Sequence, residues 1–305
     1  MTDTDDGYTV FEMTKAHWQS LGKAGAAHKH CYGHAVVVSG PMGQGGAARL
    51  AARGALRIGA GLVSVLCQTD AVLEHAAQLN AIMVKPYAAT TDFTEHLAKI
   101  KPQAVCIGPN LGLEHASQIL LSDVILSGVP TCFDADAITL MADPLISLPD
   151  IVNPQSVLTP HEGELRRLIP ERFDKTSCRH ALAQSAANKM GCVVLLKGPE
   201  TIVSAPNMES KIVMAKPFKN TSWLATAGSG DVLAGFITGL LARGFDALEA
   251  ATIAADLHFR CAEGFGAGLI AEDIPEMLPK ILQWNSADAD TAASAQNGKG
   301  QRYDC

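Results

Sequence analysis

The stretch AVVVSGPMGQGGAARLAARGALRIGAGLVSVLC, residues 35–67, contains the pattern that decides the fold. Two mainly apolar runs, at 35–39 and 62–67, have the length and composition of buried strands. Between them, a glycine-rich turn at 40–46 leads into a helical pattern at Ala47–Ile58. Because a helix that joins two adjacent strands places them parallel, the stretch predicts a strand–helix–strand unit.

The same alternation of strands and helices continues along the chain. Further apolar runs occur at 104–107, 131–134, 156–159 and 193–196. Helical patterns occur at Ala71–Leu79, Glu114–Leu126 and Cys178–Lys189. Strands that are apolar on both faces are typical of a parallel sheet covered by helices on both sides. We therefore predict a three-layer α/β/α fold with a mainly parallel central sheet.

The C-terminal third of the chain changes character. TIVSA, PNMES and KIVMA at 201–215 predict an antiparallel hairpin, and so a small antiparallel edge of the sheet. Asp246 followed by Glu249 predicts a capping box that begins a helix through about Glu263. A last element is expected at Ile274–Leu282. Residues 285–305 lack apolar content and are expected to be a disordered tail, which leaves 1–284 as a single domain.

Composition narrows the class of protein. The 305 residues are 48% hydrophobic and 18% charged, as in a soluble globular protein with a large core. The net charge of -7 includes no block of Lys and Arg, so we expect a small-molecule substrate and no nucleic acid. Eight cysteines form no C-x-x-C pair. That usage, an acidic N-terminus and the lack of a membrane-spanning run predict a cytoplasmic protein.

Several familiar motifs are absent from the sequence. It contains no G-x-x-x-x-G-K-[ST], no H-E-x-x-H and no G-x-S-x-G, which argues against P-loop ATPases, zincin proteases and α/β-hydrolases. The histidines show no metal-ligand spacing. The turn at 40–46 is only a weak dinucleotide fingerprint, and it is interpreted as a tight turn, a close approach for a ligand, or both.

The stretch TAGSGDVLAG, residues 226–235, carries the chemistry. Gly228, Ser229 and Gly230 precede an uncharged helix, and their N–H groups can converge on an anion. Asp231 in the first turn has two interpretations: a partner of the helix dipole, or a base beside a bound phosphate. The combination of small residues, a carboxylate and an apolar helix favours phosphoryl transfer to an alcohol.

The chain resembles the ADP- or ATP-dependent NAD(P)H-hydrate dehydratases, carbohydrate-kinase-domain repair enzymes of the ribokinase-like superfamily. The resemblance covers about Ala27 to Leu282. The motifs that carry it, in order, are HKHCYGHAVVVSG (28–40), GGAARLAARGALRIGAGLV (45–63), AVCIGPNLG (104–112), FDADAI (133–138), LTPHEGE (158–164), LLKGPETIV (195–203), ATAGSGDVLAG (225–235) and LHFRCAEG (257–264). A ribokinase-like fold is implied.

The resemblance also assigns roles to residues. The residues implied to contact the hydrated cofactor are Ala47, Asn110, His161 and Asp231, with Asp231 also the catalytic aspartate. Those implied to hold the nucleotide are Lys197, Gly198, Pro199, Glu200, Thr201 and Gly230, and Gly228 and Ser229 complete the predicted phosphate cradle. Glu164 matches an acid near the metal. Four departures from the family pattern occur. Asn110 stands where the family has glycine, Glu162 where a proline is usual and Trp223 where a smaller residue is expected, and ADLHF (255–259) replaces the usual V-Y-L-H-G.

The implied reaction restores NADH and NADPH from their hydrated forms, NADHX and NADPHX, and acts on the S epimer. ADP or ATP donates its terminal phosphoryl group to the ring hydroxyl, giving AMP or ADP, and phosphate then leaves. Asp231 serves as base, and Mg²⁺ bridges phosphate oxygens with few protein ligands. The resemblance further implies a homotetramer and an NAD(P)H-hydrate epimerase on a separate chain.

Two alternatives remain open at this point. A kinase for hydroxymethylpyrimidine or hydroxyethylthiazole would use the same fold and the same Gly–Asp junction. A nucleotide-binding regulatory protein without turnover is the other. Asp134 and Asp136, which follow the run at 131–133, are interpreted either as an outer shell for Mg²⁺ or as strand-end caps.

Overall fold

A computed structural model describes residues 8–25, 27–147, 152–214 and 218–283. Within these ranges the chain forms one ten-stranded sheet. Its strands are β1 (Tyr8–Val10), β2 (His34–Val38), β3 (Leu62–Gln68), β4 (Met83–Tyr87), β5 (Ala104–Ile107), β6 (Thr131–Phe133), β7 (Val157–Leu158), β8 (Val193–Leu196), β9 (Thr201–Ser204) and β10 (Ser210–Val213). Their order across the sheet is β1-β10-β9-β8-β7-β6-β5-β2-β3-β4.

The sheet is mainly parallel, as predicted. Only β9 runs antiparallel to its neighbours β8 and β10, which confirms the hairpin at the 201–215 stretch. The hairpin does not form the edge itself, because β1 pairs parallel with β10 outside it. Neither β1 nor β4 is predicted from the sequence. Both are edge strands, and β4 contains Pro86. Proline has no N–H group to donate, and an edge strand tolerates this because one of its sides has no neighbouring strand.

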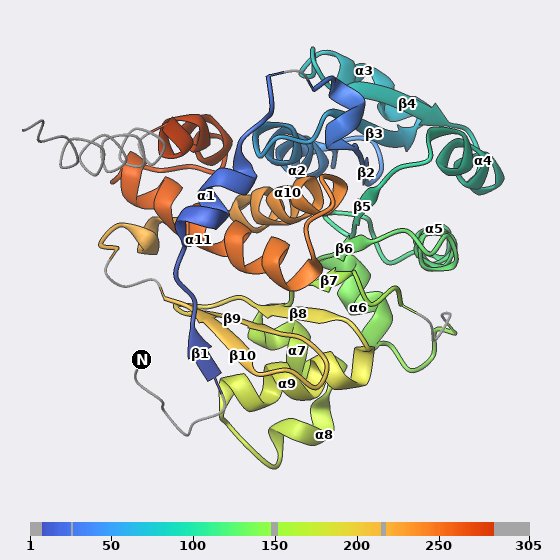
Figure 1. Cartoon of the computed structure of the whole chain (residues 1–305). Helices are drawn as coiled ribbons and strands as arrows, with labels where there is room; N and C mark the ends of the chain where they lie inside the picture. The colour runs from blue at the N-terminus through green and yellow to red at the C-terminus, as the bar shows by residue number, and fades with distance from the viewer. Residues whose placement is uncertain (1–7, 26, 148–151, 215–217, 284–305) are drawn as a thin grey trace, which may run out of the picture.

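Helices cover both faces of the sheet (Figure 1). One face carries α1 (Lys15–Leu21), α2 (Gly46–Arg57), α3 (Val72–Ala76), α10 (Ser229–Ala242), α11 (Ala247–Phe265) and a helix at 273–283. The other carries α4 (Thr90–Ile100), α5 (His115–Leu126), α6 (Asp136–Ala142), α7 (Glu162–Leu168), α8 (Pro170–Phe173) and α9 (Arg179–Met190). Alternate residues of β2 enter the two cores, since Val37 belongs to one and Val36 to the other. This confirms the three-layer α/β/α prediction.

Close packing of α2 against α10 fixes where α10 begins. A Cβ atom on Gly235 of α10 would lie 2.1 Å from the carbonyl oxygen of Ala51 in α2, so only glycine permits this approach. Because α10 is buried along its length, its N-terminus is held rigidly beside the carboxyl ends of the central strands. Figure 1 shows α2, α10 and α11 side by side on one face.

Some predicted details differ. The helix expected at Ala71–Leu79 is shorter, a 3-10 turn followed by α3. Asp246 does cap α11, accepting from the N–H of Leu248, but the capping box with Glu249 is not formed. The predicted last element is present at 273–283, and the predicted tail at 285–305 lies outside the described residues. No helix in the described ranges is long and apolar enough to cross a membrane.

Candidate functional site

One part of the candidate site, which contains Ala47 and Asn110, lies where the order of the strands reverses. β2 pairs with both β3 and β5, so the chain leaves β2 in one direction and later returns on its other side. Ligands of open α/β sheets bind at such a point, outside the carboxyl ends of the strands. The loops that follow β2 and β5 meet there: a Cβ atom on Gly40 would lie 1.7 Å from the carbonyl oxygen of Asn110.

The glycine-rich turn before α2 is not an open phosphate cradle. The carboxylate of Glu74, from α3, accepts hydrogen bonds from the N–H groups of Gly43 at 2.7 Å and Gly45 at 3.1 Å. The protein's own anion therefore occupies the position that a phosphate would take. Ala47, predicted to contact the substrate, is the second residue of α2 and is buried beside this turn.

Asn110 has a backbone conformation that glycine adopts freely. Its φ of 50° lies in the left-handed region, which asparagine adopts more readily than most residues with a side chain. The side chain is exposed, and its amide donates a 3.5 Å hydrogen bond to the carbonyl oxygen of Gln44. The replacement therefore preserves the loop after β5 and adds a polar group at the reversal point.

His161 and Glu164 form the capping box of α7, directly after β7. The ring Nδ1 of His161 accepts from the N–H of Glu164 at 3.1 Å, and Oε2 of Glu164 accepts from the N–H of His161 at 2.8 Å. His161 is exposed and Glu164 is buried. Both side chains thus cap a helix, and Oε1 of Glu164, which lies outside the two capping hydrogen bonds, is 3.5 Å from Nε2 of His161. Among the described residues, no group of three His, Cys, Asp or Glu side chains could hold a metal ion.

A buried ion pair joins the ends of β6 and β8. Oδ1 of Asp134 accepts from Nζ of Lys197 at 2.8 Å and from Oγ1 of Thr159 at 2.7 Å. Burial acts to lower the pKa of Lys197, but the attraction and hydrogen bond of Asp134 outweigh it and raise the pKa. Lys197 is therefore a firmly charged ammonium. It also faces the start of α10, because a Cβ atom on Gly230 would lie 3.6 Å from its Nζ.

Asp231 lies in the first turn of α10 with a perturbed proton affinity. Burial, together with repulsion from Asp134, raises its pKa to about 7, while Lys197 acts to lower it. A carboxyl group with this pKa is suited to accept and release a proton near neutral pH. The cap residue of α10 is Gly228, and no side chain caps the helix by a hydrogen bond. A favourable helix dipole would lower the pKa of a carboxyl group, so the raised pKa favours the base over the helix-dipole interpretation.

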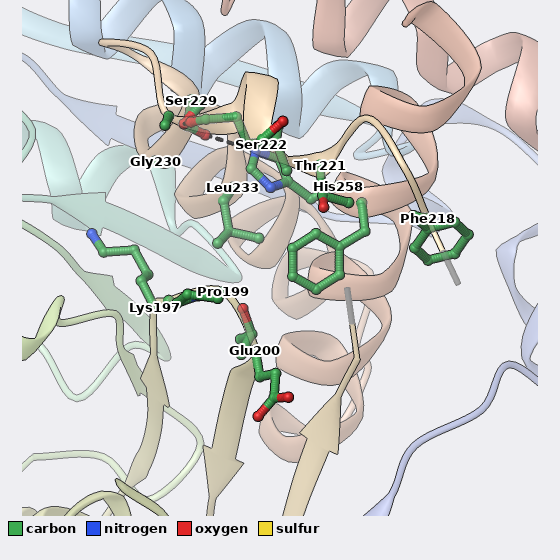
Figure 2. A pocket seen from close by; sticks show the side chains of 15 residues that line it. Lys197, Pro199, Glu200, Phe218, Thr221, Ser222, Ser229, Gly230, Leu233 and His258 are labelled. Atoms are coloured by element: carbon green, nitrogen blue, oxygen red, sulfur yellow. Dashed lines mark hydrogen bonds between the residues drawn. The ribbon is translucent and has the colours of Figure 1, made fainter. Parts of the chain in front are cut away.

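A cavity of about 800 Å³ opens beside this cluster (Figure 2). It is lined by Lys197, Gly198, Pro199, Glu200, Thr201, Phe218, Thr221, Ser222, Leu224, Ala225, Ser229, Gly230, Leu233, His258 and Phe259. Figure 2 shows Lys197, Ser229 and Gly230 at one end of the cavity and Phe218 at the other. One end therefore offers an ammonium and helix N–H groups, which suit phosphates, and the other an aromatic wall, which suits a base.

Seven of the eight residues predicted to hold the nucleotide line this cavity. Gly228 does not line it. Its φ of 89° and its position against Leu50 and Ala271 make it a structural glycine that starts the helix. Thr201 is buried as the first residue of β9. Trp223 is 44% exposed and is not part of the lining.

Two residues of the site carry no role in the sequence analysis. Nε2 of His258 donates to the carbonyl oxygen of Ser229 at 3.0 Å, and burial lowers the pKa of His258 to about 4, so the ring is neutral. Its place in LHFRCAEG is the signal that points to it. Arg179 donates to the carbonyl oxygens of Lys197 and Glu200 at 3.0 and 2.9 Å and so braces the nucleotide turn. No sequence signal identifies Arg179.

Comparison with known proteins gives a consistent result. Residues 35–283 match the family described as NAD(P)H-hydrate dehydratase. The chain is 37% identical over 227 residues to the ADP-dependent (S)-NAD(P)H-hydrate dehydratase of Lactococcus lactis, which covers 72% of this chain and 76% of that protein. It is 33% identical over 258 residues to the bifunctional NAD(P)H-hydrate repair enzyme of Coxiella burnetii, covering 83% of this chain and 51% of that protein. The chain thus spans about half the length of the bifunctional relatives it matches.

Solved structures share the fold. The ADP/ATP-dependent NAD(P)H-hydrate dehydratase from Bacillus subtilis, co-crystallized with ATP and Mg²⁺, superposes with a TM-score of 0.73 at 27% identity, covering 88% of this chain and 96% of that one. Ribokinase-like structures have the same arrangement of strands and helices, which confirms the ribokinase-like fold that the resemblance implied.

Proposed function

Because the chain belongs to the NAD(P)H-hydrate dehydratase family, we propose that it uses ADP or ATP to dehydrate the S epimers of NADHX and NADPHX and so restores NADH and NADPH. One observation carries the proposal. Asp231, whose carboxyl group has a pKa near neutrality, is the third residue of α10 and directly follows Ser229 and Gly230, which line the phosphate end of the cavity. This is the arrangement needed to take a proton from a hydroxyl group while that hydroxyl attacks a phosphate.

The residues divide the reaction between them. The oxygen of the ring hydroxyl bonds to the terminal phosphorus of the nucleotide, and Asp231 accepts the proton that this hydroxyl loses. The bond from that phosphorus to the bridging oxygen breaks, leaving AMP from ADP or ADP from ATP. The N–H groups at Ser229 and Gly230, and the ammonium of Lys197, stabilise the charge on the transferring oxygens. The ring nitrogen then expels phosphate, a proton leaves the neighbouring carbon, and the nicotinamide double bond is restored.

Magnesium fits this site only as an ion shared with the nucleotide. Oε1 of Glu164 is the one oxygen of that side chain outside the capping hydrogen bond, and Asp134 is already paired with Lys197. Mg²⁺ characteristically keeps several waters and binds one or two carboxylates together with substrate phosphates. Glu164 would hold the ion, which would neutralise charge on the phosphate oxygens. The single domain at 1–284, the tetramer and the cytoplasmic location stay predictions.

The proposal is tested with the purified protein, hydrated NADH of defined epimer composition, and ADP or ATP in parallel. We expect the absorbance of NADH to recover in step with phosphate release, one nucleotide being consumed per NADH, and only the S epimer to react at once. A stable phosphorylated alcohol formed from hydroxyethylthiazole or hydroxymethylpyrimidine, without NADH recovery, would favour the kinase alternative. Nucleotide binding with no phosphate released from any of these substrates would favour the regulatory one.

A further inference from the structure

Asp134, at the carboxyl end of β6, is a buried carboxylate that the proposed reaction does not use directly. It is 2% exposed and is not among the residues that line the cavity. Its oxygen Oδ1 is occupied by the ammonium of Lys197 and the hydroxyl of Thr159. A buried carboxylate is strongly unfavourable unless it is paired in this way. A role in the outer shell of Mg²⁺ is therefore a poorer explanation than a role in placing Lys197.

We infer that Asp134 is a positioning residue: it holds the ammonium of Lys197 against the N-terminus of α10, where the transferring phosphoryl group passes between the nucleotide and Asp231. The expected effect of Asp134 on turnover rests on the proposed function, but the interaction between Asp134 and Lys197 can be measured without turnover. Asp134 acts here only through Lys197.

The lysine needs such an anchor. Its ammonium ends a flexible four-carbon chain, and 23% of the side chain is exposed at the mouth of the cavity. Without a partner, the lysine side chain would populate many rotamers, and only some of them place the ammonium where it can assist turnover. The hydrogen bond to Asp134 at 2.8 Å selects the rotamer in which Nζ faces Gly230. The charge is then fixed where phosphoryl oxygens become most negative.

The backbone around Asp134 is itself held in an unusual conformation. Ala135 has φ 48° and ψ −114°, a conformation that residues with a side chain rarely adopt. On its other side, Oδ2 of Asp136 accepts from the N–H of Gly112, in the loop after β5, at 2.9 Å. Strain of this kind persists only where surrounding contacts impose it. The two carboxylates thus brace different loops: Asp134 the nucleotide turn, Asp136 the loop of Asn110.

Packing prevents this segment from relaxing. A Cβ atom on Gly108 would lie 1.7 Å from the carbonyl oxygen of Asp134, so the ends of β5 and β6 are in direct contact. The carboxylate is also fixed by Thr159 at the end of β7. The anchor of Lys197 is therefore rigid and spans neighbouring strands of the parallel sheet, which is what a device for placing a charge requires.

The first test is a double-mutant cycle on turnover with Asp134→Asn, Lys197→Met and both together. Asparagine keeps the shape of the side chain and can still accept from Thr159. We expect Asp134→Asn to lower kcat by roughly 10- to 100-fold, with ADP affinity changed less than about threefold, because Lys197 acts on the developing charge. The double variant should be no slower than Lys197→Met within about twofold. Glu276→Gln, which removes the partner of Arg53 and Arg57 on the surface, is the control with normal turnover.

The second test needs no turnover. Acetic anhydride acylates the neutral amine only, and because Asp134 raises the pKa of the half-buried Lys197, its loss should lower that pKa. We expect Lys197 to be acylated at least tenfold faster in Asp134→Asn, read by mass spectrometry, with the exposed Lys99 unchanged as an internal control. An unchanged rate at Lys197 overturns the inference even if the protein is inactive on hydrated NADH, and an inactive wild type with faster labelling contradicts only the proposed function.

Other outcomes also decide the matter. Additive losses in the cycle would show that Asp134 acts independently of Lys197 and would overturn the inference, as would a parallel loss of melting temperature, ADP binding and turnover. If Asp134→Asn does not fold, Lys197→Arg takes its place, since it keeps the charge but moves it. We expect that variant to bind ADP and to lose turnover about as much as Lys197→Met does. Normal turnover in Lys197→Arg would mean that placement is unimportant.

Discussion

Asp231→Asn should stabilise the protein at alkaline pH while it abolishes most turnover. In the folded chain burial and Asp134 raise the pKa of Asp231 from its ordinary value of 3.8 to about 7. In the unfolded chain the carboxyl group releases its proton near pH 4, so between these values the folded state binds more protons and its stability falls as the pH rises. The two pKa values differ by about three, which corresponds to a penalty of at most about 4 kcal/mol above pH 7.

The asparagine variant has no such penalty. Its free energy of unfolding should exceed that of the wild type by an amount that grows by about 1.4 kcal/mol per pH unit between pH 5 and 7 and is constant above pH 7. Water in the open cavity and the N–H groups of α10 make about 4 kcal/mol an upper value for the final difference. Turnover should fall by about 10²–10⁴, because the amide cannot accept the hydroxyl proton.

Both effects are measured on the same preparations. Urea unfolding at pH 5, 6, 7 and 8 gives the stability difference, and recovery of NADH absorbance gives the rate. Calorimetry with ADP should show an affinity close to that of the wild type, since Asp231 does not line the cavity. If the variant instead loses about 1 kcal/mol at every pH and keeps near-normal turnover, Asp231 is only a partner of the helix dipole and the catalytic assignment is wrong.

Three further changes test the site. Arg179→Met removes two hydrogen bonds to the turn at Lys197–Thr201 and should weaken ADP binding by about tenfold in calorimetry, whereas unchanged affinity would mean that the turn supports itself. Thr201→Val should leave β9 intact by circular dichroism but weaken ADP binding by roughly three- to tenfold, and equal affinity would remove Thr201 from the nucleotide site. Gly228 and Gly244 both have a φ near +90°, but only Gly228 has side chains close to where a Cβ atom would lie. Gly228→Ala should therefore lower the free energy of unfolding in urea by about 2 kcal/mol more than Gly244→Ala does. Equal losses would refute the packing argument.

Local pattern was sufficient for much of the fold. The strands at 104–107 and 193–196 were predicted to the residue, because four apolar residues between turns can only be buried on both faces. The hairpin of β9 and β10 was predicted for a similar reason. The strands β1 and β4 are not predicted because each lies at a sheet edge. An edge strand pairs with only one neighbour and has a mixed composition, so it lacks the apolar run that identifies a central strand.

Some features of the candidate site can likewise be predicted from the sequence, and others only from the fold. The nucleotide turn at 197–201 and the Gly–Asp junction at 228–231 are contiguous motifs, so the sequence alone identifies them. The sequence does not show that the first glycine-rich turn is already occupied. Only the fold places the Glu74 carboxylate in that turn and leaves the second turn open to the cavity.

The sequence by itself determined a βαβ architecture, an anion-binding helix start and a carboxylate beside it, because each depends on residues within a few positions of one another. Tertiary structure decided what that carboxylate can do. Asp134, Lys197 and Asp231 come from two strand ends and a helix, and their charges interact because the sheet brings these ends together out of water. The pKa of a group depends on burial and on charges within a few ångströms, and neither is set by distance along the chain.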